Sequence, residues 1–152
     1  QKQNCEDFRA IWLGGLTVDS SGVPHWGGSA IAAIGEEVLV GTVTEVAVPF
    51  RRETSPIVGM DRGTQYLYDF GGGNTFILEV QSTAVFNFPA GKNPIGYYRD
   101  VSRIVKGTGR FANATGNVAQ SGPYIVWFTV PGDFSTLTAV YTAELHGKIC
   151  ME

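Results

Sequence analysis

Apolar and polar side chains alternate along most of this chain with a period of two, which is the pattern of β-strands with one buried face. Between Thr75 and Phe88, for example, Phe76, Leu78 and Val80 share one side of an extended backbone, and Glu79 lies on the other. No segment keeps the 3.6-residue apolar period of a helix over three turns. The pattern therefore predicts an almost entirely β protein.

Glycine, proline and asparagine residues divide the alternating segments into eight or nine predicted strands. These strands cover residues 8–13, 29–34, 38–50, 64–70, 75–88, 97–106, 111–120, 124–130 and 136–149. Gly14 and Gly15 are expected to end the first strand. The segment 71–74 (Gly-Gly-Gly-Asn) is expected to turn a hairpin, because these residues accept a positive φ at little cost. An open sheet of this size would leave two unprotected edges, so we expect an all-β fold, a closed antiparallel β-barrel of about eight strands.

The composition fits one small globular domain. The 152 residues suffice for one hydrophobic core and not for two, so residues 1–152 are expected to form a single β-barrel domain. Apolar residues make up 43% of the chain and charged residues 16%, which excludes coiled coils, collagen and strongly disordered chains. The net charge is -3 and no basic run is longer than Arg51-Arg52, which argues against a nucleic acid partner. No stretch reaches the ~18 consecutive apolar residues of a membrane span.

Two cysteines, Cys5 and Cys150, lie near opposite ends of the chain, and the strands of a barrel commonly bring the ends together. A disulfide between them is expected, and two free thiols are the alternative that the sequence leaves open. Together with Gln1 in place of an initiator methionine, this suggests a secreted or periplasmic protein that has lost its leader, although a shortened chain would look the same. The cysteines and two distant histidines do not have metal-ligand spacing, so neither a metal nor another cofactor is expected.

A glycine-rich block follows the sixth predicted strand. Residues 105–116 read Val-Lys-Gly-Thr-Gly-Arg-Phe-Ala-Asn-Ala-Thr-Gly. This block resembles the Gly-Thr-Gly-x-Phe-x-x-Ala-x-Gly signature shared by plant dirigent proteins and the allene oxide cyclase-like barrels. The Gly-Thr-Gln-Tyr strand at 63–66 and the long strand at 75–88 are similar to the same families in the same order. The resemblance therefore covers about residues 40 to 147.

The residues of this block are interpreted as structural. Gly107 and Gly109 flank Thr108 and permit a sharp bend between strands, Phe111 fills the core, and Gly116 allows close backbone approach or a bulge. No helical pattern follows the block, so it does not match a phosphate-binding loop.

The resemblance implies an eight-stranded barrel whose lumen binds a hydrophobic or aromatic small molecule. In allene oxide cyclases the cavity folds a fatty-acid epoxide for ring closure, and in dirigent proteins it orients phenolic radicals. Relatives of this kind often form a homodimer or a homotrimer. This chain departs from both families, because its first strand offers Arg9 and Trp12 but no inward carboxylate, and because Thr115 stands where dirigent proteins have an arginine. Neither named activity is therefore carried over.

Polar side chains on the predicted strands are the candidates for chemistry. A carboxylate inside an apolar barrel would have a raised pKa and could act as an acid or a base near neutral pH. Glu79, in the middle of a long strand, is the first catalytic candidate, and the alternative is that it faces solvent outside the barrel. The remaining candidates are Glu45, Asp69, Glu144, His146 and the phenols of Tyr66, Tyr68, Tyr98 and Tyr141.

Large side chains on the strands are the candidates for ligand contact, and the alternative is that they only fill the core. They are Trp12, Tyr66, Tyr68, Phe76, Leu78 and Tyr141. Three functions remain open: a barrel that binds a small hydrophobic or aromatic ligand unchanged, a cyclase or isomerase whose cavity imposes a reactive conformation, and a structural or interaction protein with a filled barrel. The missing carboxylate favours the binding barrel over the enzyme.

Overall fold

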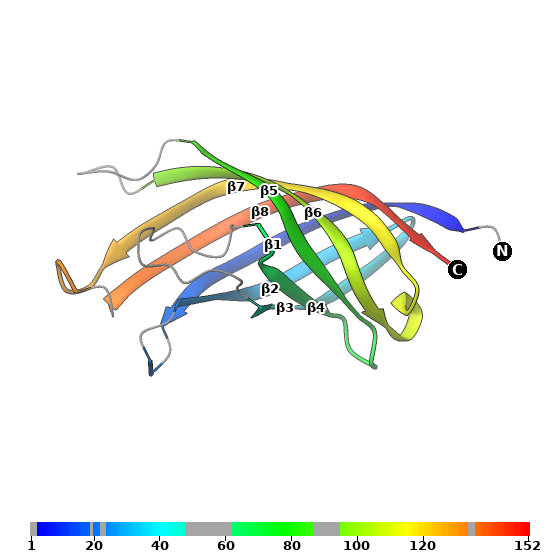
Figure 1. Ribbon diagram of the computed structural model, residues 1–152, viewed down its shortest axis with the longest axis horizontal. Coiled ribbons are helices and arrows are strands. Elements are labelled where there is room, and N and C mark those ends of the chain that lie inside the picture. Colours follow the sequence, from blue (N-terminus) through cyan, green and yellow to red (C-terminus); the bar gives the residue numbers. More distant parts are fainter. Residues whose placement is uncertain (1–2, 19, 22–23, 48–61, 87–94, 134–135) are drawn as a thin grey trace.

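The computed structural model describes residues 3–18, 20–21, 24–47, 62–86, 95–133 and 136–152, and these form a closed barrel (Figure 1). Its elements are β1 (Asn4–Val18), β2 (Pro24–Ile34), β3 (Glu37–Ala47), β4 (Gln65–Asp69), β5 (Thr75–Phe86), β6 (Ile95–Thr108), the 3-10 turn η1 (Gly109–Phe111), β7 (Thr115–Phe128) and β8 (Leu137–Met151). Each strand pairs antiparallel with the next, and β1 pairs with β8. The predicted closed antiparallel barrel is confirmed. Within the described residues, no helix has the length and apolar character needed to cross a membrane.

The strands are displaced along one another around the barrel. Starting from Gly96 in β6, the line of cross-strand partners passes through β7, β8, β1, β2, β3, β4 and β5 and returns to β6 at Gly107. A sheet that closes with such an offset has tilted strands and an interior wide enough for side chains.

The alternation of side chains decides which of them enter the lumen. In β6 every second residue from Gly96 to Ile104 is buried, and the residues between them are exposed. Large inward side chains lie beside small ones: Trp12 is paired with Ala30 of β2 and with Ala143 of β8. The indole can therefore extend across the lumen over its small neighbours.

Two strands continue through positions where the sequence predicted a break. β1 continues through Gly14 and Gly15, and β7 joins the segments that were predicted as separate strands at 111–120 and 124–130. The reason at Gly14 is close packing, since a Cβ there would lie 2.3 Å from the Gly27 carbonyl oxygen and 2.8 Å from the Tyr141 hydroxyl. A Cβ at Gly122 would lie 1.8 Å from the Thr142 carbonyl oxygen. These glycines allow the backbones to approach and do not break the strands.

One end of the barrel, here called the terminal end, carries both chain termini, the β4–β5 hairpin and η1 (Figure 1). Gly71, Gly72 and Gly73 all have positive φ, so the predicted hairpin turn is confirmed. The disulfide between Cys5 and Cys150 is also confirmed, and these two residues are direct partners in the β1–β8 ladder.

The glycine-rich block lies at the terminal end, and its five residues interpreted as structural all have close contacts or a special backbone conformation. Gly109 has φ 58°, and the Thr108 hydroxyl donates a 2.7 Å hydrogen bond to the Gly73 carbonyl. A Cβ at Gly107 would lie 1.8 Å from the Phe111 carbonyl oxygen, and one at Gly116 would lie 2.1 Å from that of Lys148. Phe111 is fully buried, 5.2 Å from the Phe76 ring, and closes the core at this end. The predicted strand start at residue 111 is wrong, because η1 and a turn precede β7.

Candidate functional site

Aromatic side chains fill the part of the lumen away from the terminal end. The aromatic cluster, as named here, consists of Trp12, Trp26, Tyr66, Tyr98, Tyr124 and Tyr141. Tyr141 lies at its centre, with ring centroids 4.4 Å from Trp12 and 4.7 Å from Trp26, both in edge-to-face geometry. Edge-to-face packing at these distances is the favoured arrangement of aromatic rings.

The aromatic cluster contains hydrogen-bond donors that lack partners. Four buried atoms form no hydrogen bond with any described residue: Nε1 of Trp12, Nε1 of Trp26 and the hydroxyls of Tyr124 and Tyr141. Leaving a buried donor unsatisfied costs about 1 to 3 kcal/mol. These donors are suited to a bound molecule that carries acceptor oxygens.

A second group, the polar cluster, lies beside the aromatic one and consists of Tyr98, Asp100, Ser102 and Gln120. The Gln120 amide donates to Asp100 Oδ2 at 3.1 Å and to the Tyr98 hydroxyl at 3.4 Å. The Ser102 hydroxyl donates to Asp100 Oδ1 at 3.2 Å. Asp100 and Gln120 are direct partners across β6 and β7, so the strand register itself places amide and carboxyl together.

Burial changes the acidity of these groups. The pKa of Asp100 is raised to about 7 because burial disfavours the charged carboxylate, while the Ser102 hydrogen bond opposes the shift. Burial also raises the pKa of Tyr98 and Tyr141, and it raises that of Tyr124 to about 12. The phenols therefore keep their protons at neutral pH, whereas Asp100 can exchange one.

Glu45 is a second carboxylate on the inner side of the barrel wall. Its side chain is fully buried, and Oε1 lies 3.6 Å from Nδ1 of His25. Glu45 pairs with Tyr66 across β3 and β4, and its charge contributes to the raised pKa of Tyr141. Within the described residues, the lumen thus contains two carboxyl groups, Glu45 and Asp100.

All six candidates for ligand contact face the interior and are buried. The structure divides them between two places. Trp12, Tyr66 and Tyr141 belong to the aromatic cluster. Tyr68 and Phe76 stack at 5.1 Å toward the terminal end. Leu78 is the cross-strand partner of Tyr66 and also points inward.

Glu79, the first catalytic candidate, lies on the outer face of β5. Its carboxylate accepts a 2.8 Å hydrogen bond from Gln65 and is 3.4 Å from Arg103. The pKa of Glu79 is lowered, chiefly by the hydrogen bonds from Gln65 and Gln81. The expected raised pKa of a luminal carboxyl group is therefore found at Asp100 and not at Glu79.

The remaining polar candidates lie outside the lumen. Asp69 accepts a hydrogen bond from the Gly71 amide and so belongs to the β4–β5 turn. Glu144 and His146 are exposed on the outer face of β8. No group of three or more His, Cys, Asp or Glu side chains within the described residues could hold a metal ion.

Asp100 and Gln120 were missed at the level of the sequence, although a signal was present. In the predicted strand 97–106, Asp100 occurs two residues after Tyr98 and four before Ile104, so the three share a face. That face also carries Ser102. No family model matches the chain, and no curated protein or solved structure is similar enough to match it.

Proposed function

We propose that this barrel binds a small aromatic or otherwise hydrophobic molecule that carries an acceptor oxygen, held in the lumen against the aromatic cluster. The observation that supports this most strongly is the set of buried donors on Trp12, Trp26, Tyr124 and Tyr141 that lack partners within the described part of the chain. A ligand that only filled apolar space would leave them unsatisfied. A ligand with an ether, carbonyl or hydroxyl oxygen would satisfy one or more of them.

Two simple probes test this ligand class. Naphthalene and 2-methoxynaphthalene share an aromatic body, and only the second has an acceptor oxygen. We expect calorimetric titration to show binding of both, with the methoxy compound about 5- to 10-fold tighter, since one hydrogen bond contributes about 1 kcal/mol. The double variant Tyr124→Phe/Tyr141→Phe should reduce this preference, because it removes two of the four donors and keeps both rings.

Tyr97→Phe is the matched control. It also removes one phenol hydroxyl, but Tyr97 is exposed on the outer face of β6, next to the buried Tyr98. This variant should keep the preference for 2-methoxynaphthalene. Absence of binding by either probe, or equal affinities in the wild type, would contradict the proposal. That result would support the alternative of a structural protein with a filled barrel. The burial of Trp12, Tyr68 and Tyr98 is compatible with this alternative.

A cyclase or isomerase is the second candidate function, and Asp100 favours it. A luminal carboxyl group with a pKa of about 7 can donate or accept a proton near neutral pH, while the surrounding rings would orient an unsaturated substrate. Incubation with lipid and polyphenol extracts, followed by mass spectrometry, would detect a product. Asp100→Asn should abolish product formation and leave binding of 2-methoxynaphthalene intact, whereas recovery of only unchanged ligands would exclude this activity for the extracts used.

A further inference from the structure

The outer wall of β1, β2 and β3 exposes large apolar side chains in a continuous arrangement. Ile11, Ile31 and Val40 are direct cross-strand neighbours, and each exposes more than half of its surface, at 52%, 55% and 67%. Leu13 and Val38 extend the same face. Single exposed apolar residues are ordinary, but a contiguous apolar patch marks an interaction surface.

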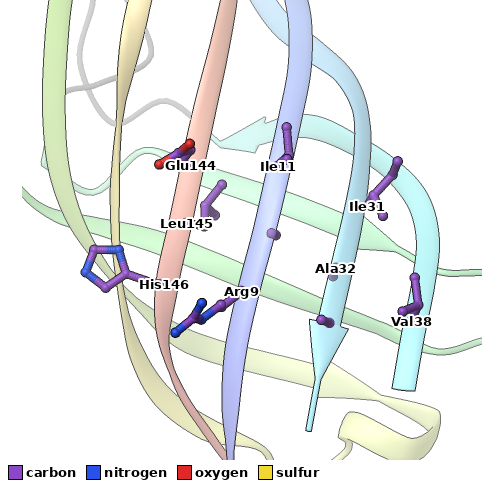
Figure 2. Close-up of a pocket in the computed structure, with 10 residues that line it drawn as sticks. Arg9, Ile11, Ile31, Ala32, Val38, Glu144, Leu145 and His146 are labelled. Atoms are coloured by element: carbon purple, nitrogen blue, oxygen red, sulfur yellow. The ribbon is translucent and has the colours of Figure 1, made fainter. Parts of the chain in front are cut away.

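This wall is hollowed. A pocket of about 540 Å³ is lined on its outer side by Arg9, Ile11, Ile31, Ala33, Val38, Glu144 and His146. Figure 2 shows the apolar side chains of β1, β2 and β3 on one side of the pocket and Arg9, Glu144 and His146 on the other. A second hollow of about 410 Å³, which includes Leu13, Ile95, Ile125 and Val140, continues the apolar surface over β8, β7 and β6.

The charges beside the pocket have a self-complementary arrangement. Arg9 is paired with His146 and Ile11 with Glu144 in the β1–β8 ladder, so Arg9 and Glu144 are diagonal neighbours. Within the described part of the chain, neither Arg9 nor Glu144 has an ion pair or a side-chain hydrogen bond. In a two-fold contact, Arg9 of each copy can meet Glu144 of the other, which gives two equivalent ion pairs from one geometry.

We propose that the outer wall of β8, β1, β2 and β3 is the interface of a two-fold homodimer. Its apolar centre would be the row of Ile11, Ile31 and Val40, and its charged rim would be Arg9 and Glu144, which is the usual anatomy of a protein interface. Four strands about 4.8 Å apart, with a rise of about 3.3 Å per residue, make a patch roughly 20 Å on a side. The planar area of this patch is about half of the ~800 Å² that each partner of a stable interface buries. The adjoining hollow, which includes Leu13, Ile125 and Val140, continues it.

The oligomeric state of the full chain tests this directly. Sedimentation equilibrium at micromolar concentration should give twice the mass of the 16.4 kDa chain. Ile31→Lys should shift the protein to a monomer and weaken association at least 10-fold, because it places two charges at the centre of the contact. Val105→Lys is the control: Val105 is also an exposed valine, but it lies on β6 away from this wall, and the variant should remain dimeric.

A charge exchange identifies the pairing. Arg9→Glu alone and Glu144→Arg alone should each weaken the dimer, because each places like charges opposite one another, and the double variant should restore it. Circular dichroism would verify that every variant is folded. A monomeric wild type, a mass three times that of the chain, or single variants that associate normally would overturn the proposal. Binding of the monomer to anionic lipid vesicles would assign the wall to a membrane surface instead.

Discussion

At the scale of single residues, the inner face of β6 combines core side chains with an acid. Tyr98 and Ile104 pack in the lumen, and between them Asp100 is only 2% exposed. The hydrogen bonds from Ser102 and Gln120 compensate for part of the lost hydration. Desolvation nevertheless prevails, so the protonated carboxyl group is favoured in the folded protein at mildly acidic pH.

This shift predicts how stability depends on pH. The pKa of Asp100 rises from an ordinary value of 3.8 to about 7 on folding, so the folded state binds the proton more tightly than the unfolded state. The stabilisation is complete below about pH 4 and is lost as the pH rises through about 7, a decline of about 4 kcal/mol at about 1.4 kcal/mol per pKa unit. Urea denaturation should show this decline in the wild type and not in Asp100→Asn. Asp69→Asn, in the exposed hairpin, should keep it, and a pH-independent difference between wild type and Asp100→Asn would contradict the assignment.

At the scale of elements, tyrosines of one strand lie over glycines of the next. Tyr141 of β8 pairs with Gly14 of β1, and Tyr124 of β7 pairs with Gly96 of β6. Each glycine provides the space that a ring from the neighbouring strand occupies. The register of these strand pairs therefore depends on a tyrosine ring in one strand packing over a glycine in the next.

Gly96→Ala tests this fit. The added Cβ would lie 2.3 to 2.6 Å from atoms of the Tyr124 side chain, so we expect a loss of about 1 to 3 kcal/mol of unfolding free energy. Gly27→Ala is the control, since its Cβ would meet only the Val43 carbonyl oxygen, at 3.3 Å. In a Tyr124→Leu background the Gly96 substitution should cost less, and equal costs in both backgrounds would show that the ring is not responsible.

At the scale of the whole molecule, closure depends on the first and last strands. β1 and β8 are paired from Asn4 with Met151 to Leu16 with Ala139, and the disulfide joins them at the terminal end. The bridge connects residues 145 positions apart in the chain, so it restricts almost the whole unfolded polypeptide.

Loss of the disulfide should therefore be costly. On the chain-entropy account, Cys5→Ser/Cys150→Ser should lose about 4 to 5 kcal/mol of unfolding free energy in chemical denaturation. A reductant should lower the denaturation midpoint of the wild type to that of the double variant, and it should leave the double variant unchanged. Coincident midpoints for wild type and variant in the absence of reductant would contradict this expectation.

Much of the fold could be predicted from local pattern. Period-two alternation grouped Phe76, Leu78 and Val80 on one face of their strand, and the structure buries all three, because a residue's face follows from its parity within a strand. The site could be predicted only in part. Alternation placed Glu79 on the face opposite Leu78 and Val80. Only the closed sheet decided that the face of Glu79 is the outer one.

The sequence by itself determined the all-β class, the hairpin at residues 71–74 and the number of strands to within one, because these depend on side-chain alternation and on backbone freedom at single residues. Only the tertiary structure decided that Gly14 continues a strand, that Asp100 meets Gln120, and that unpaired donors gather in the lumen. The physical reason is that these features arise from contacts across strands, whose register is set by closure of the whole barrel.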